Sequence, residues 1–184
     1  MSHISSAVEY GLHCLLRLVN LPDEIPSPSA RDLADLQGLP ADYVSTVMTK
    51  LNKAGITKAT EGLRGGIRLA RPAEQISFLD VVTAIDGPKK LFECRDVRER
   101  CALFGGSPPE WASSGVCSIH AVMLAAEAEM RRMLASRSLA DVAAHAGKRV
   151  PPDFIGNTRT WMVRRGASRR TNRPAGDGGT AKSR

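Results

Sequence analysis

The chain has 184 residues, a net charge of +7 and a hydrophobic content of 42%, with only 4% aromatic residues. This length suits one domain with extensions or two very small domains, and the core must be largely aliphatic. No segment approaches the roughly 18 apolar residues of a membrane span, and no basic leader precedes an uninterrupted apolar run, so a cytoplasmic protein is expected.

The first part of the chain predicts a winged helix-turn-helix. Residues 3–20 carry apolar side chains at helical spacing, which predicts a helix. Ser29 begins a second helix with Asp32 three positions on, as in a capping box, and "GLP" at 38–40 ends it. A third helix, "ADYVSTVMTKLNKAG", places Tyr43 among its inward side chains. Two β-capable runs, 56–60 and 67–70, then flank the glycine-rich turn "EGLRGG". Helix, tight turn, helix and hairpin in this order form a winged helix-turn-helix.

The rest of the chain predicts further helices and a long loop. Residues 76–87, 118–134 and 138–146 have helical patterns, and a Gly/Pro-rich loop separates the first two. The predicted fold class is therefore mainly α with a small β-hairpin wing. Residues 148–184 lack periodicity and are predicted to be unstructured, with ten Lys/Arg against two acids. Such a tail either binds a polyanion such as nucleic acid or is only a solvated extension.

The third predicted helix would lie in the major groove of DNA, where the second helix of a helix-turn-helix reads bases. Hydroxyl side chains can contact bases or phosphates, and lysines and arginines suit phosphates. The predicted DNA contacts are Ser45, Thr46, Thr49, Lys50 and Lys53 on the helix, and Arg64 and Arg68 on the hairpin. Pro40 stands at the cap position of this helix, where Ser, Thr, Asp or Asn would be better. A structural helical domain is the alternative.

Three of the four cysteines, Cys94, Cys101 and Cys117, lie in the long loop, with His120 just after it. Their spacing is too irregular for a zinc ribbon and lacks the pairs of a ferredoxin motif. No second motif supplies the base that a catalytic cysteine would need, so no enzymatic activity is expected. Unremarkable loop residues are one alternative. An exposed iron–sulfur cluster is another, provided that other ligands arrive from elsewhere. Cys14 is expected to be a small core residue.

The first helix offers such ligands in Glu9 and His13. These residues are four positions apart, so their side chains project from one face of the helix. The alternative is an ordinary hydrogen bond between the two side chains on a solvated face.

Several stretches in their order resemble one family. They are "SAVEYGLHCLLRLV", "ARDLADLQGLPADYVSTVMTKLNKAGITKATEGLRGGIRLARP", "ISFLDVVTAIDG" and the three-cysteine loop. Together they resemble the iron–sulfur winged-helix transcription regulators (IscR/NsrR-like) over roughly residues 3–140. The resemblance implies a homodimer joined through residues 118–134 that binds a pseudo-palindromic operator in double-stranded DNA. The implied regions are the winged helix-turn-helix (1–72), the connecting helix and cluster loop (73–117), the dimerisation helix (118–147) and the basic tail (148–184).

The resemblance also implies an iron–sulfur cluster held by loop cysteines and a ligand from the first helix or His120. In the commoner pattern the three cysteines are close together, whereas fifteen residues here separate Cys101 from Cys117. The stretch "VEYGLHC" is nearest to the redox-switching branch with a 2Fe–2S cluster. The implied ligands are therefore Cys94, Cys117, Glu9 and His13, and the alternative is a 4Fe–4S cluster that includes Cys101. Tyr10 is a candidate relay of redox change.

These implications define the expected function. The chain would be a transcriptional regulator, most simply a repressor, that senses redox state, nitric oxide or iron status through its cluster. The alternative is a regulator or interaction module without a cluster, in which the thiols are structural, bind zinc or are oxidised directly.

Overall fold

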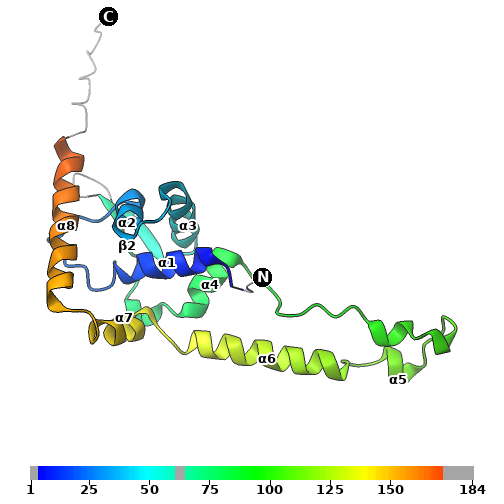
Figure 1. Ribbon diagram of the computed structural model, residues 1–184. Coiled ribbons are helices and arrows are strands. Elements are labelled where there is room, and N and C mark those ends of the chain that lie inside the picture. Colours follow the sequence, from blue (N-terminus) through cyan, green and yellow to red (C-terminus); the bar gives the residue numbers. More distant parts are fainter. Residues whose placement is uncertain (1–3, 61–64, 172–184) are drawn as a thin grey trace, which may run out of the picture.

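The computed structural model describes residues 4–60 and 65–171 and shows a head, a long arm and a helix that returns to the head (Figure 1). We call α1 to α4 with the β1–β2 hairpin the DNA-reading head. Its elements are α1 (Ser6–Leu16), α2 (Ala30–Gln37), α3 (Ala41–Lys53), β1 (Thr57–Thr60), β2 (Gly66–Leu69) and α4 (Phe78–Asp86). The arm and the return comprise α5 (Glu110–Ser113), α6 (Ser118–Ala135), α7 (Leu139–Gly147) and α8 (Pro152–Thr171). No described helix is long and apolar enough to cross a membrane.

The predicted winged helix-turn-helix is confirmed, and local sequence explains its ends. The Asp32 backbone N–H donates to the Ser29 hydroxyl at 3.1 Å, and the Ser29 N–H donates to the Asp32 carboxylate at 2.9 Å. This capping box satisfies two backbone donors at the start of α2. Gly38 ends the helix in the left-handed region with φ +66°, a conformation that glycine adopts without strain. Pro40 precedes α3 and gives it no side-chain cap.

The wing is the antiparallel pair β1–β2, in which Thr57 pairs with Leu69 and Thr60 with Gly66. Its connection, residues 61–64, includes Arg64 and lies outside the described residues, so the prediction for Arg64 stays a prediction.

One hydrophobic core joins the head to α7. Its buried residues come from α1, α2, α3 and α4 and include Leu139 of α7. Cys14 is completely buried in this core, as expected. The core thus crosses the expected boundary at residue 72, because Ile76, Val81 and Ile85 pack onto the helices before it.

The arm helix α6 has no buried residue, although it carries an apolar stripe. Ile119 is 67% exposed, Val122 68% and Met133 58%. Unpartnered apolar side chains along an 18-residue helix are typical of a surface that another chain covers.

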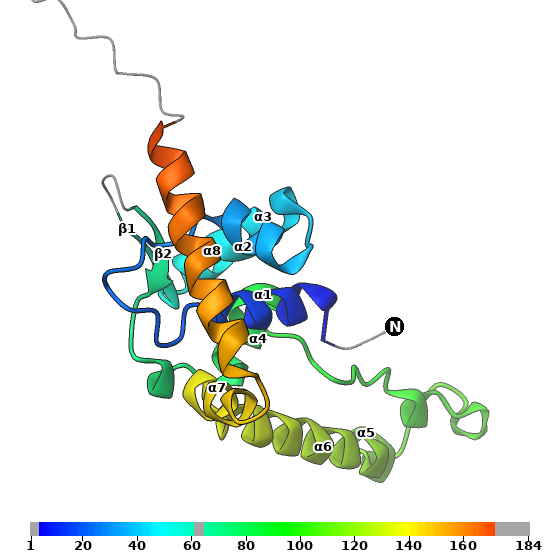
Figure 2. The same cartoon turned by 60° about the vertical axis from the view of Figure 1, so that its left-hand side comes forward.

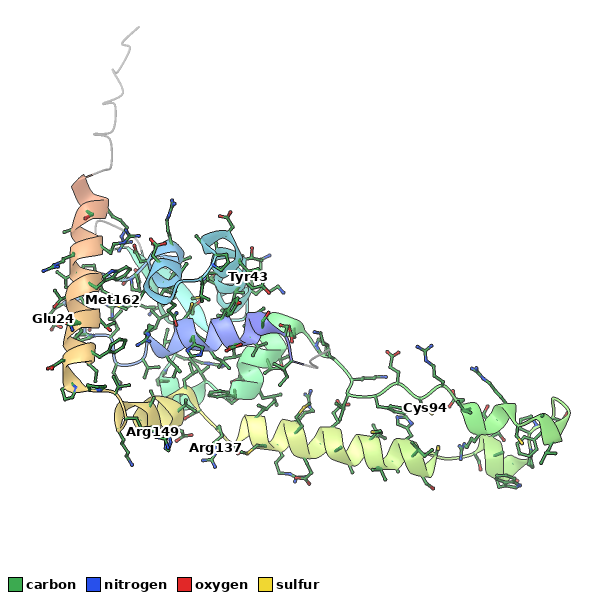
Figure 3. The ribbon with its side chains drawn as sticks, in the orientation of Figure 1. Glu24, Tyr43, Cys94, Arg137, Arg149 and Met162 are labelled. Atoms are coloured by element: carbon green, nitrogen blue, oxygen red, sulfur yellow. The ribbon has the colours of Figure 1, made fainter. Side chains whose placement is uncertain are left out.

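The prediction that residues 148–184 are unstructured is wrong for α8. This helix returns along the head, where Met162 is 3% exposed (Figure 3). Ion pairs from Arg165 and Arg169 to Asp32 hold it there. Helix α8 is held by ion pairs to distant residues and has no apolar stripe in its own sequence. The spacing of apolar residues therefore does not predict this helix.

Candidate DNA-reading head and thiol loop

The exposed face of α3 carries most of the predicted DNA contacts. Ser45, Thr46, Thr49 and Lys53 are all exposed. The Thr46 and Thr49 hydroxyls donate to the carbonyls of Asp42 and Ser45, at 3.0 and 2.9 Å. These bonds fix the hydroxyl oxygens on the helix surface and leave them able to accept hydrogen bonds from a partner.

Lys50 is exposed and also makes a contact within the protein, and its predicted contact with DNA stays a prediction. Its Nζ donates to the carbonyl of Ile85, at 2.7 Å, in the last turn of α4. A lysine ammonium at the C-terminal end of a helix interacts favourably with the helix dipole. Lys50 therefore connects α3 to α4, and Lys53 is exposed on the outer face of α3.

Arg68 is also engaged inside the protein. Its Nε donates to the Ser27 hydroxyl at 2.9 Å, and its two terminal nitrogens donate to backbone carbonyls of the α1–α2 loop. An ion pair to Asp23 at 3.2 Å completes the set. These contacts use the guanidinium to hold the wing against the loop. The predicted contact of Arg68 with DNA stays a prediction.

Tyr43 does not lie where its helical spacing predicts. It was expected inward, but it is 42% exposed on α3. Its ring meets the ring of Tyr10 edge to face, with centroids 5.7 Å apart and planes at 77°. This pair directly links α1 to α3 (Tyr43 is labelled in Figure 3). Tyrosine has an apolar ring and a polar hydroxyl, so it occurs both in cores and on exposed surfaces. Helical spacing alone therefore cannot predict whether Tyr43 is buried or exposed.

Glu9 and His13 lie exposed on α1, beside an open groove of about 590 Å³. We call it the α1 groove. It is lined mainly by apolar side chains, among them Ile4, Leu12, Leu16, Phe78 and Val142. Among the described contacts, neither a hydrogen bond nor an ion pair joins the Glu9 carboxylate to the His13 imidazole. The alternative of a mutual hydrogen bond therefore finds no support, and both groups can bind something else.

Cys117 stands at the start of α6, as its N-cap residue. The backbone N–H groups of His120 and Ile119 are directed toward its sulfur, without the geometry of a full side-chain cap, and they lower the pKa of the Cys117 thiol. Arg98 contributes to the same lowering. Its guanidinium donates to the carbonyls of Ser114 and Gly115, which fixes it close by. Thiols at helix N-termini near a cation favour the thiolate, the form that binds metals.

The other two loop cysteines differ in their surroundings. The Cys94 sulfur lies 3.5 Å from the Asp96 carboxylate and is half-buried. Cys101 is exposed. The His120 ring packs against Phe92, with centroids 5.8 Å apart.

The structure does not bring the predicted ligands together within one chain. In the part of the chain that it describes, no group of three or more His, Cys, Asp or Glu side chains could hold a metal ion. Cys94 lies on the extended segment leading away from the head (Figure 3), and Glu9 and His13 lie on α1 within the head. Any site that uses both halves must therefore draw them from two chains.

Comparisons with known proteins agree with this architecture. A family model described as "Rrf2: Iron-dependent Transcriptional regulator" matches residues 4–145. The protein "Putative HTH-type transcriptional regulator Rv1287" of Mycobacterium tuberculosis (strain ATCC 25618 / H37Rv) is 32% identical over 143 residues, 78% of this chain and 82% of the relative.

Two solved structures share the fold. That of T. potens IscR has a TM-score of 0.60 at 21% identity and covers 84% of this chain and 96% of its own. That of CymR (YrzC), described as the global cysteine regulator of B. subtilis, has a TM-score of 0.56 at 22% identity. It covers 79% of this chain and 98% of its own.

Proposed function

We propose, from the premise that this chain belongs to the Rrf2 family of transcriptional regulators, that it regulates transcription through a bound iron–sulfur cluster. DNA binding by a winged helix-turn-helix is the common property of the family and needs no further proposal. The proposal concerns the signal: redox state, nitric oxide or iron status would change the cluster, and the cluster would change operator binding. Repression by a homodimer on a pseudo-palindromic operator is the simplest form.

The observation that carries this proposal is the arrangement on α1. Glu9 and His13 are exposed, and Tyr10 beside Glu9 packs its ring on Tyr43 of the DNA-reading helix α3. A change in the group that Glu9 and His13 bind can therefore shift α1. The direct contact between the two rings would pass this shift to Tyr43 on α3. Two rings in direct contact transmit small displacements, because one ring cannot move toward the other without pushing it.

The donor chemistry fits an iron–sulfur cluster. Cys94 and Cys117 would supply thiolates, and the lowered pKa of Cys117 favours that form. Glu9 and His13 would complete a 2Fe–2S ligand set, and Cys101 would join only in a 4Fe–4S alternative. When bound, the cluster supplies a centre whose charge changes with oxidation state. Because Glu9 and His13 lie far from the loop cysteines in one chain, they would serve the loop of a second copy.

Two exposed apolar surfaces support a second copy. The stripe on α6 is exposed along the arm, and the α1 groove beside Glu9 and His13 is open and apolar. Joining two copies through such surfaces removes apolar area from water, which stabilises the assembly by about 25 cal/mol per Å² of buried apolar surface.

Anaerobic purification tests the cluster. Wild-type protein should be coloured, with visible absorbance that bleaches on reduction. Cys117→Ser should lose that absorbance, and Cys101→Ser should keep it if the 2Fe–2S set is right. Resonance spectroscopy of Glu9→Gln and His13→Ala should show altered ligation. A colourless wild-type protein with full iron supply would contradict the proposal.

Operator binding tests the coupling. Wild-type affinity for DNA should differ between the oxidised and reduced protein, and Glu9→Gln and His13→Ala should abolish that difference while leaving DNA binding intact. Tyr10→Ala should weaken the difference, since it removes the ring contact with Tyr43. Unchanged redox dependence in all three variants would refute the role of α1.

A thiol-based regulator without a cluster is the second candidate. The lowered pKa of the half-buried Cys117 thiol favours it, because thiols of low pKa are readily oxidised. One structural neighbour of this chain is described as a cysteine regulator, and another as the oxidized form of Staphylococcus aureus CymR. Here the purified protein would be colourless, and peroxide would change DNA binding through Cys117 alone.

A further inference from the structure

Helix α8 lies beyond the part of the chain that matches the family, yet it is tightly joined to the DNA-reading head. Arg169 in its last turns makes three contacts. Its terminal nitrogens donate to the carbonyls of Gly65 at 3.1 Å and Ser27 at 2.8 Å. Its Nε lies 3.2 Å from the Asp32 carboxylate, as an ion pair without hydrogen-bond geometry. One side chain thus joins the turn end of the wing, the α1–α2 loop and α2.

Arg165, one turn earlier, holds α8 to α2. Its Nε donates to Asp32 at 3.2 Å, and its Nη2 pairs with Asp35. The Asp32 side chain is only 4% exposed, so its charge needs partners to offset the loss of hydration. The two arginines of α8 supply them.

The backbones of α8 and the loop also fit closely. Gly166 is buried against Pro26, and a β-carbon added to Gly166 would lie 2.7 Å from Pro26 Cβ and 2.8 Å from Cγ. The proline ring is rigid, so a larger residue at 166 must push α8 away from the loop.

The wing reaches the same loop from its other side. Ile67 N–H donates to the Pro28 carbonyl at 2.8 Å, and a β-carbon on Gly66 would lie 2.1 Å from the Ser27 carbonyl oxygen. Arg68 of the wing binds the Ser27 hydroxyl, and Arg169 of α8 binds the Ser27 carbonyl. Ser27, which is 3% exposed, therefore stands between the wing and α8.

We propose that α8 is a clamp that fixes the wing on the DNA-reading head, with Arg169 as the wing-positioning residue, so that operator recognition depends on a helix beyond residue 145. This inference rests on DNA binding by the head and is independent of the cluster. A wing held next to its connecting turn keeps that end of the hairpin in one place. Pre-organisation of this kind raises affinity by reducing the ordering that binding requires.

Direct contact of α8 with DNA phosphates is the competing role for this arginine-rich helix. The contacts favour the clamp, because the guanidinium groups of Arg165 and Arg169 already bind carboxylates and carbonyls of the protein itself. Figure 2 shows α8 running beside β1 and β2 with its last turns next to the wing.

The experiment uses a duplex that wild-type protein selects from a random-sequence pool, and a scrambled duplex of equal composition. Gly166→Leu undocks α8 without changing charge, and Gly156→Leu is its control, because nothing lies within 4 Å of a β-carbon at Gly156. Arg169→Ala removes the bridging side chain, and Arg164→Ala removes an exposed charge of the same helix.

The clamp predicts that Gly166→Leu and Arg169→Ala bind the selected duplex about three- to tenfold more weakly, because binding must then order a wing that is no longer held in place. Binding to the scrambled duplex should change less. Amide hydrogen exchange should accelerate in residues 57–60 and 66–69 of these two variants. Gly156→Leu and Arg164→Ala should stay within about twofold of wild type.

The opposite pattern would overturn the clamp. If Arg164→Ala weakens both duplexes and reduces the salt dependence, while Gly166→Leu binds normally, α8 acts through phosphates. If exchange shows that α8 is undocked and the selected duplex still binds with wild-type affinity, the wing needs no clamp. A wild-type protein that selects no duplex would instead contradict DNA binding by the head, and the clamp with it.

Discussion

Two cysteines of this chain lie in opposite electrostatic surroundings. Burial raises the pKa of Cys14 from 9.0 to about 11, although a hydrogen bond from Gln37 and the charge of Arg17 oppose the rise. Cys117 is half-buried at a helix start, and its thiol has a lowered pKa. The same side chain is thus an inert core group at one position and a candidate ligand at the other, and only the fold distinguishes them.

The raised pKa of Cys14 makes stability depend on pH in the alkaline range. Above about pH 9 the thiol ionises in the unfolded chain but stays protonated in the folded one until about pH 11. Rising pH in this window therefore favours unfolding, by up to about 2–3 kcal/mol. The stability advantage of wild type over Cys14→Ala should shrink accordingly in urea unfolding between about pH 8 and pH 11. Parallel curves for the two proteins would show that Cys14 does not titrate in this way.

At the scale of elements, the two lysines of α3 perform different tasks. Lys50 binds the carbonyl of Ile85 and joins α3 to α4, and Lys53 remains on the outer face. The DNA-reading helix is thus oriented by one lysine and presents the other.

Substitution of each lysine should separate these tasks. Lys53→Ala should reduce the slope of log affinity against log salt by about 0.9 for each lost phosphate contact, so by about 1.8 for a homodimer in which both copies carry the substitution. Lys50→Ala should leave that slope unchanged and destabilise the fold by about 1 kcal/mol, because it removes a hydrogen bond from a charged group. Titration with a duplex selected in vitro and thermal unfolding measure the two effects. Equal salt slopes for both variants would contradict the distinction.

Local sequence was sufficient for elements that local interactions determine. The capping box of Ser29 and Asp32, the hairpin glycines and the period of α3 predicted the winged helix-turn-helix and its exposed face. The engagement of Lys50 and Arg68 depends on backbone carbonyls that the fold brings close, such as that of Ile85, 35 positions away. The docking of α8 depends on Arg165 meeting Asp32 across 133 positions. No local pattern encodes such contacts.

At the scale of the whole molecule, the arm leaves apolar side chains unpartnered. The stripe on α6 and the α1 groove are both exposed in the single chain. The candidate ligands are divided between the head, which carries Glu9 and His13, and the arm, which carries the loop cysteines. The described part of one chain therefore has the features of half an assembly, as the family leads one to expect.

A charge on the α6 stripe should prevent that assembly. Val122 is 68% exposed in one chain, and Val122→Glu would bury a carboxylate if a second copy covers it. We expect dimerisation at least about tenfold weaker than in wild type, measured by sedimentation equilibrium. Val163→Glu makes the same change on exposed α8 and serves as the control. Equal dimerisation of Val122→Glu and wild type would place the interface elsewhere.

The return of α8 to the head also has a consequence during protein synthesis. Asp32 leaves the ribosome early, whereas its partner Arg165 follows 133 positions later. At about 5–20 residues per second this interval is roughly 7 to 27 s. During that time the nascent head has its helices but not its clamp. The nascent head therefore lacks the contacts of Arg165 and Arg169 until α8 has also been synthesised.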